Sequence, residues 1–163
     1  MFDKFGEMNS AAEINELAEN LKKEGDLEGL KTMAEENGIS SDFVELFKEG
    51  AIPYLCDPYT AASCKLDLET KDLGLKGLML DWVEYIRSLC AESPEMAGAV
   101  RTKGKYLKDC MAKLLQYSFK NRMKVSDQIL KAAKINASRV DFGFPGIGEA
   151  KKMIREFYLG GGK

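Results

Sequence analysis

Hydrophobic residues recur every three or four positions over most of the chain, which is the spacing of amphipathic helices. The first such segment has Ser10 as a good N-cap, with Glu13 three residues later to complete a capping box. A second segment is capped by Asp26 and ends at Gly38, and a short third segment begins at Ser40 or Ser41 and ends at Gly50. The pattern therefore predicts a module of three short helices over residues 1–50.

The periodicity fades over residues 51–74, where Pro53 and Pro58 interrupt the chain, and we expect a loop there. It returns over residues 75–89 and again over residues 103–122, which predicts one helix in each segment. The buried face of the second of these helices is expected to consist of Leu107, Cys110, Met111, Leu114, Leu115 and Phe119.

Two shorter helices are expected over residues 126–133, with Ser126 as the cap, and over residues 149–158. A loop containing a short extended piece lies between them, and glycines 160–162 follow the last. Strand-like alternation is too scarce to build a sheet. The sequence therefore predicts an all-α fold of several helices. We expect an acidic helical module at 1–50 and a main helical domain at 51–163, or a single domain overall.

The composition excludes several classes of enzyme. The 163 residues contain no His, which rules out Ser-His proteases, His-dependent nucleases and HExxH metalloproteases. No run of eighteen apolar residues is present, and the first residues lack the basic and then apolar pattern of a signal peptide. We therefore expect a cytoplasmic protein that is not an enzyme and does not act at a membrane.

Charge is distributed very unevenly along the chain. Residues 1–60 contain 14 Asp or Glu and 5 Lys or Arg, whereas residues 101–163 contain 5 acidic and 15 basic residues. Either the two parts neutralise each other, or one of them faces a partner of opposite charge. The basic part of the sequence offers a candidate nucleic-acid surface, with aromatic residues interleaved. Its residues are Lys105, Lys108, Lys113, Lys120, Arg122 and Lys124.

The four cysteines allow three interpretations. Cys56, Cys64, Cys90 and Cys110 would suffice for one tetrahedral structural zinc site, although no CxxC knuckle is present. Alternatively they are reduced thiols that fill the core, which is common for free cysteine. Disulfides are the least expected use in an intracellular protein.

A glycine-rich loop, residues 143–148, precedes a helix that carries Lys151 and Lys152 near its start. Backbone N–H groups in such a loop can bind a phosphate. The loop matches neither a Walker A motif nor a dinucleotide-binding fingerprint. The alternative is a turn whose glycines provide backbone angles that other residues avoid.

Several segments resemble small accessory proteins of conjugative elements and phages of Gram-positive gut bacteria. These are residues 2–7 (FDKFGE) and 10–15 (SAAEIN). Residues 105–110 (KYLKDC), 125–127 (VSD) and 154–158 (IREFY) are similar in part to PcfK-like proteins of conjugative plasmids. Proteins of this kind include inhibitors of type II CRISPR systems.

The resemblance implies an anti-CRISPR protein that binds the RNA-guided nuclease (Cas9) of a type II system and blocks its engagement of target DNA. Such a nuclease holds its heteroduplex in a positively charged channel, which acidic side chains can approach. The acidic residues expected to bind it are Glu13, Glu16, Glu19, Asp26, Glu28, Glu35 and Glu36. The alternatives are a nucleic-acid-binding accessory protein of conjugation or replication, and a scaffold that binds neither partner.

Overall fold

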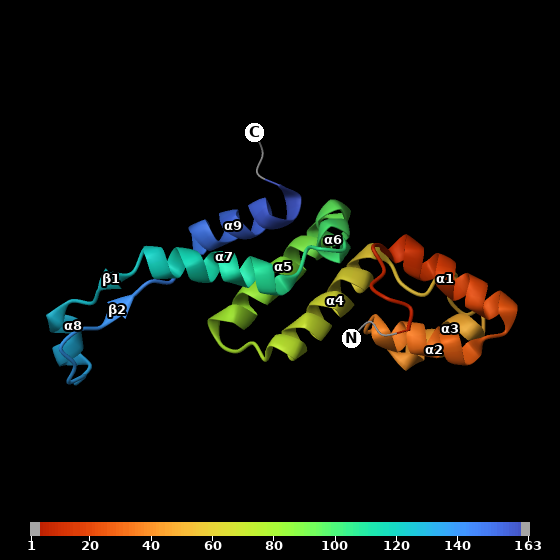
Figure 1. Ribbon diagram of the computed structural model, residues 1–163, viewed down its shortest axis with the longest axis horizontal. Coiled ribbons are helices and arrows are strands. Elements are labelled where there is room, and N and C mark those ends of the chain that lie inside the picture. The colour runs from red at the N-terminus through yellow and green to blue at the C-terminus, as the bar shows by residue number, and fades with distance from the viewer. Residues whose placement is uncertain (1–3, 161–163) are drawn as a thin grey trace. The chain divides into compact units, whose positions relative to one another are not determined.

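The computed structural model describes residues 4–160, and within that range the fold is all-α with one pair of very short strands, which confirms the expected fold class (Figure 1). The chain forms two units, residues 1–108 and 109–163, which we describe one at a time. The expected division after residue 50 stays a prediction. Phe2, Asp3, Gly161 and Gly162, on which parts of the sequence interpretation rest, lie outside the described residues.

The first three helices begin at the residues that the sequence predicts as caps. The Ser10 hydroxyl accepts a hydrogen bond from the Glu13 N–H at 3.1 Å. The Glu13 carboxylate accepts one from the Asn9 N–H at 2.6 Å, one residue earlier than in a standard capping box. Asp26 and Ser40 cap the next two helices in the same way. The three helices are α1 (Ala11–Glu24), α2 (Leu27–Glu36) and α3 (Ser41–Lys48).

The loop expected over residues 51–74 is wrong, because a helix occupies most of that segment. The Asp57 carboxylate accepts a hydrogen bond from the Thr60 N–H at 2.6 Å, and Pro58 is the first helical residue. The Asp-Pro pair therefore starts a helix instead of a turn. The remaining helices of this unit are α4 (Pro58–Leu73), α5 (Leu78–Glu92) and α6 (Pro94–Arg101).

Two charged residues on the inner face of α4 explain why the hydrophobicity pattern does not predict this helix. Lys65 and Glu69 are buried there together with Ala61, Ala62 and Leu66. A charged residue counts as a surface position in a hydrophobicity pattern, so the inward stripe looks interrupted. In the folded protein α4 has one buried face and one exposed face, although its sequence does not show the hydrophobic pattern of an amphipathic helix.

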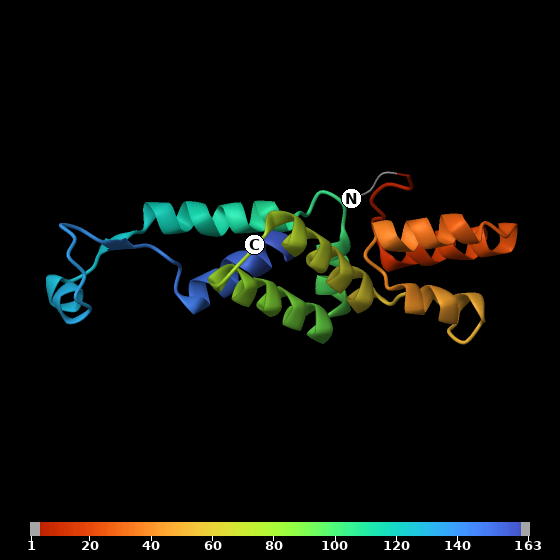
Figure 2. The same ribbon diagram turned by 90° about the horizontal axis from the view of Figure 1, so that it is seen from below.

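The helices of the first unit pack in two groups that share a core. α2 packs against α1 and α3, while α4 packs against α5 and α6 (Figures 1 and 2). The hydrophobic cluster of the first three helices includes Leu55 and Cys56 and continues to Ala61 on α4. The core therefore runs without a break from the N-terminal helices into the chain that follows them.

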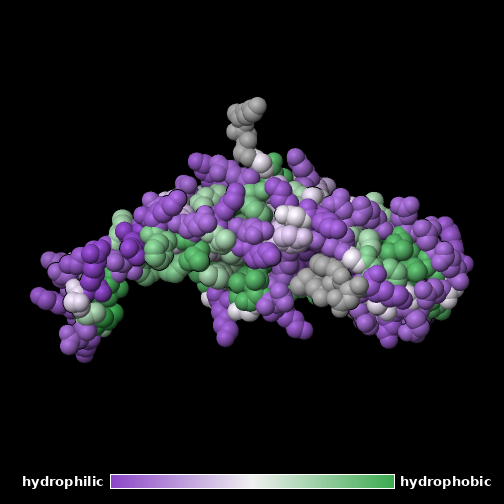
Figure 3. Space-filling model, in the orientation of Figure 1, coloured by the Kyte–Doolittle hydropathy of each residue, from purple (hydrophilic) through white to green (hydrophobic). Residues whose placement is uncertain are grey.

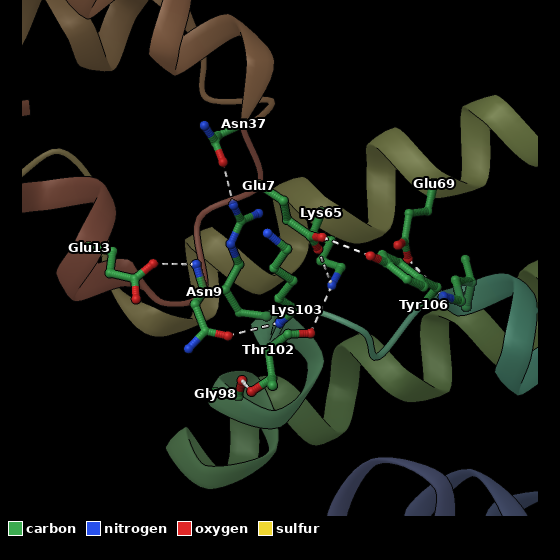
Figure 4. A network of polar contacts seen from close by, with 12 residues as sticks. Glu7, Asn9, Glu13, Asn37, Lys65, Glu69, Gly98, Thr102, Lys103 and Tyr106 are labelled. Carbon is green, nitrogen blue, oxygen red and sulfur yellow. Dashed lines mark hydrogen bonds and ion pairs between the residues drawn. The ribbon is translucent and has the colours of Figure 1, made fainter. Parts of the chain in front are cut away.

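A network of buried polar groups joins the segment before α1 to α4 and to the end of α6 (Figure 4). The Lys65 ammonium lies 2.8 Å from the Glu7 carboxylate, and both side chains are almost completely buried. Lys65 also donates a hydrogen bond to the Thr102 carbonyl at 3.1 Å, and the Tyr106 hydroxyl donates one to Glu7 at 3.1 Å. These contacts hold residues that are far apart in the sequence in one place.

Two more charged groups complete the network. The Glu69 carboxylate accepts a hydrogen bond from the Leu107 N–H at 2.9 Å, and its burial raises its pKa. Arg101 is only 1% exposed and donates to the side-chain oxygen of Asn37 at the end of α2. Burial lowers the pKa of Arg101, whereas the charge of Glu7 opposes that shift. The guanidinium still remains charged at neutral pH, because its ordinary pKa is so high.

The second unit contains most of α7, a two-strand ribbon, and two further helices (Figure 2). The strands are antiparallel, with Met123 opposite Phe142 and Lys124 opposite Asp141. The elements are α7 (Leu107–Lys120), β1 (Met123–Lys124), α8 (Asp127–Ala132), β2 (Asp141–Phe142) and α9 (Ile147–Leu159). Among all the described residues, no helix has the length and apolar composition needed to cross a membrane.

The expected buried face of α7 is wrong at two positions. Leu107, Cys110, Met111 and Leu114 are buried as predicted. Leu115 and Phe119, however, are 56% and 69% exposed. They are four residues apart, so they form a second apolar stripe beside the buried one.

We expect the Lys65→Met substitution to lower the free energy of unfolding by about 3–5 kcal/mol, since it leaves the Glu7 carboxylate buried without its counter-ion. The double variant Glu7→Leu with Lys65→Met is expected to recover most of this loss, because it removes both buried charges. Urea denaturation followed by circular dichroism measures both changes. Equal stability of the wild type and the single variant would contradict a buried ion pair at this position.

Candidate functional site

The seven acidic residues expected to bind a partner divide into two groups by what their carboxylates do. Four of them have local roles within the first unit. Glu13 and Asp26 accept hydrogen bonds at the starts of α1 and α2. Glu36 accepts hydrogen bonds from the N–H groups of Lys4 and Phe5, at 2.6 and 3.0 Å.

The fourth, Glu19, lies 2.8 Å from Lys23 on the next turn of α1. This lysine lowers the pKa of Glu19, through the hydrogen bond first and the charge second. The pair is well exposed, so it contributes little to stability. These four carboxylates are therefore already partly neutralised or engaged within the chain.

The other three, Glu16, Glu28 and Glu35, are exposed. Their carboxylates form no ion pair with any residue that the structure describes. Glu28 and Glu35 are seven residues apart on α2, so they lie on the same face of that helix, about 10 Å apart along its axis. The structure thus reduces the expected acidic surface to three carboxylates that are available to a partner.

The six basic residues of the alternative surface are divided between the two units. Lys105 and Lys108 belong to the first unit, and the other four belong to the second. Lys124 lies 3.0 Å from Asp127, and the Lys113 ammonium lies 5.4 Å from the ring centre of Phe157. The remaining two residues of the second unit are Lys120 and Arg122, which are both exposed.

The four cysteines are free thiols, and the structure does not bring them together around one ion. No three Cys, Asp or Glu side chains of the described residues lie close enough to hold a metal. Burial raises the pKa of Cys56 and Cys110 to about 12 and that of Cys90 to about 11, and it also raises the pKa of Cys64. Burial thus disfavours the thiolate form, which is the nucleophilic one. The described residues therefore give no support to the zinc interpretation.

The structure contradicts one interpretation of the glycine-rich loop, namely that its glycines provide backbone angles that other residues avoid. None of Gly143, Gly146 and Gly148 has a positive φ, so special backbone angles do not explain them. Gly146 is the N-cap of α9. Gly143 instead lies against α7: a Cβ atom there would be 2.2 Å from the carbonyl oxygen of Ser118. Only a residue without a side chain permits this approach.

This close approach creates a groove in the second unit that the sequence did not reveal. The groove has a volume of about 460 Å³, and it lies between the end of α7 and the segment 140–144. Three exposed aromatic residues line it, Phe119, Phe142 and Phe144, together with Arg122. The Phe-Gly-Phe pattern at 142–144 is a sequence signal for this groove, whereas the helical spacing of Phe119 predicts a core position.

The contacts among these side chains are specific. The Arg122 guanidinium lies 4.7 Å from the ring centre of Phe119, which is the geometry of a cation–π contact. The rings of Phe142 and Phe144 meet edge to face, with 5.4 Å between their centres. The space-filling view shows hydrophobic surface over α7 and α8, among hydrophilic residues (Figure 3).

We expect Gly143→Ala to destabilise the second unit by about 1–3 kcal/mol, because the added methyl group would overlap the backbone of α7. Hydrogen exchange should become faster at the backbone amides of residues 123–125 and 140–142, where the ribbon forms. Gly148→Ala is the matched control, since a Cβ atom at that position has nothing within 4 Å. Unchanged exchange in Gly143→Ala would show that the loop does not pack against α7.

No protein-family model, curated protein or solved structure matches this chain. The resemblance to accessory proteins of mobile elements therefore stays a prediction.

Proposed function

We propose that this protein is a non-enzymatic inhibitor of the anti-CRISPR type, which binds the RNA-guided nuclease of a type II CRISPR system and blocks its engagement of target DNA. The observation that carries this proposal is the set of exposed, unpaired carboxylates Glu16, Glu28 and Glu35 on α1 and α2. They belong to residues 1–60, which contain 14 acidic residues and only 5 basic ones.

The physical basis of this proposal is charge complementarity. A type II nuclease holds its guide–target heteroduplex in a positively charged channel, which recognises a nucleic acid mainly through its backbone. Exposed carboxylates on a rigid helix would be attracted to the same lysines and arginines that bind phosphates. Bound in this way, α1 and α2 would occupy the path of the target DNA.

A binding role fits the remaining chemistry of the chain better than catalysis does. The sequence has no His, and the raised pKa of each of the four thiols leaves them protonated. The buried carboxylate with a raised pKa, Glu69, is engaged with the Leu107 N–H inside the polar network.

A cleavage assay with a guide-loaded type II nuclease of a Gram-positive gut bacterium tests the proposal. Wild-type protein is expected to inhibit cleavage of target DNA. The triple variant Glu16→Lys, Glu28→Lys, Glu35→Lys is expected to need at least about tenfold more protein for the same inhibition, because like charges would then meet in the channel. Inhibition should also weaken as salt is raised.

The matched control is the triple variant Asp72→Lys, Asp81→Lys, Glu92→Lys, which changes the net charge equally at exposed positions on α4 and α5. It should inhibit like the wild type. If both triple variants lose inhibition equally, inhibition depends on the net charge of the protein and not on Glu16, Glu28 and Glu35. If the acidic variant inhibits normally, and reversal of Lys120 and Arg122 abolishes function instead, the nucleic-acid-binding alternative replaces this proposal.

A further inference from the structure

The groove of the second unit has the composition of a protein-binding surface. Arg, Met and aromatic residues are enriched in the centres of protein interfaces. The groove has this composition, because Arg122 lines it together with Phe119, Phe142 and Phe144. Other apolar side chains of the same unit are also exposed, although they do not line the groove: Met123, Ile129, Ile135 and Ile147. Exposed apolar side chains rimmed by polar residues commonly mark protein–protein interaction sites.

The shape of the surface favours a helix as its occupant. Leu115 and Phe119 are four residues apart and form an exposed stripe on α7, and Arg122, two residues after the end of that helix, lies over the Phe119 ring. This stripe is exposed and lies beside the buried stripe of the same helix. A second amphipathic helix packed along α7 would cover it and would insert its apolar side chains between Phe119 and Phe142.

The charge of the segment around the groove indicates which charge a partner would carry. Residues 113–144 contain seven Lys or Arg and two Asp or Glu. Both acidic residues are already paired: Asp127 lies 3.0 Å from Lys124, and Asp141 lies 2.9 Å from Arg139. Lys120, Lys131 and Lys134 form no ion pair with any described residue. An acidic partner would be attracted to Arg122 in the groove and to the excess of basic residues in this segment, whereas a basic one would be repelled.

We propose that the groove formed by α7 and the segment 140–144 binds an acidic amphipathic helix of a partner protein. Apolar side chains of that helix fill the space among Phe119, Phe142 and Phe144, and its carboxylates face Lys120 and Arg122. Gly143 is a positioning residue, because its contact with α7 holds the two flanking phenylalanines at the groove. This site is independent of the carboxylates on α1 and α2.

Fluorescence anisotropy tests the proposal with a labelled helical peptide of about 18 residues that has Leu and Phe at positions i, i+3, i+4 and i+7 and Glu elsewhere. The full-length protein is expected to bind this peptide and to bind a version with Lys in place of every Glu at least about tenfold more weakly. Phe119→Ala and Phe142→Ala are each expected to weaken binding about tenfold. Arg122→Glu should weaken binding of the acidic peptide but not of the basic one.

The matched control is Ile147→Ala, which removes an equally exposed apolar side chain that does not line the groove. It should bind the acidic peptide like the wild type. All substituted side chains are exposed, and circular dichroism would confirm that each variant is folded. Loss of peptide binding with intact inhibition of the nuclease would separate this site from the proposed function.

Three results would overturn the proposal. The first is no binding of the acidic peptide, or binding that Phe119→Ala and Phe142→Ala leave unchanged. The second is tighter binding of a single-stranded oligonucleotide that the same variants abolish, since the surface would then be a nucleic-acid site. The third is concentration-dependent self-association in sedimentation that Phe119→Ala abolishes, which would make a second copy of this chain the occupant.

Discussion

The buried ion pair between Glu7 and Lys65 is the contact on which the first unit depends most. It joins the segment before α1 to the middle of α4, and its neighbours Thr102 and Tyr106 extend the connection to the chain after α6. Arg101 adds a second link, from the end of α6 to Asn37 at the end of α2. Buried charges are costly unless their partners are present, so these contacts favour one arrangement of the helices over others. The positions of α1 and α2 in the first unit are therefore fixed by buried polar contacts as well as by hydrophobic packing.

The two units offer surfaces of different chemistry. The first presents Glu16, Glu28 and Glu35, whose carboxylates are exposed and unpaired, on short helices. The second presents an apolar groove surrounded by cations, in which Gly143 permits a loop to touch α7. Charged surfaces mainly steer and orient a partner, whereas buried aromatic and arginine contacts supply most of the affinity. The two proposed sites therefore rest on different interactions, charge in the first unit and apolar contact in the second.

Local signals in the sequence predicted the parts of the fold that depend on local contacts. Ser10, Asp26, Ser40 and Ser126 each cap a helix as expected, because capping depends on residues only two or three positions away. The helix α4 was missed because its inward residues Lys65 and Glu69 are charged, and only their distant partners explain their burial.

The candidate site shows the same limit. The acidic residues could be named from the sequence, but which carboxylates are free depends on contacts such as that of Glu36 with the Lys4 N–H. Phe119 was assigned to the core because its spacing fits the buried stripe of α7, and helical periodicity alone cannot separate two adjacent stripes. The groove itself depends on the approach of Gly143 to Ser118, which are 25 residues apart in the sequence.

The most direct test of the account is size-exclusion chromatography of the wild-type protein with a guide-loaded type II nuclease, run beside a gel-shift assay with duplex and single-stranded DNA. The account predicts that the protein co-elutes with the nuclease and shifts neither form of DNA. A salt-sensitive DNA shift without co-elution would contradict it and would assign the function to the basic residues of the chain.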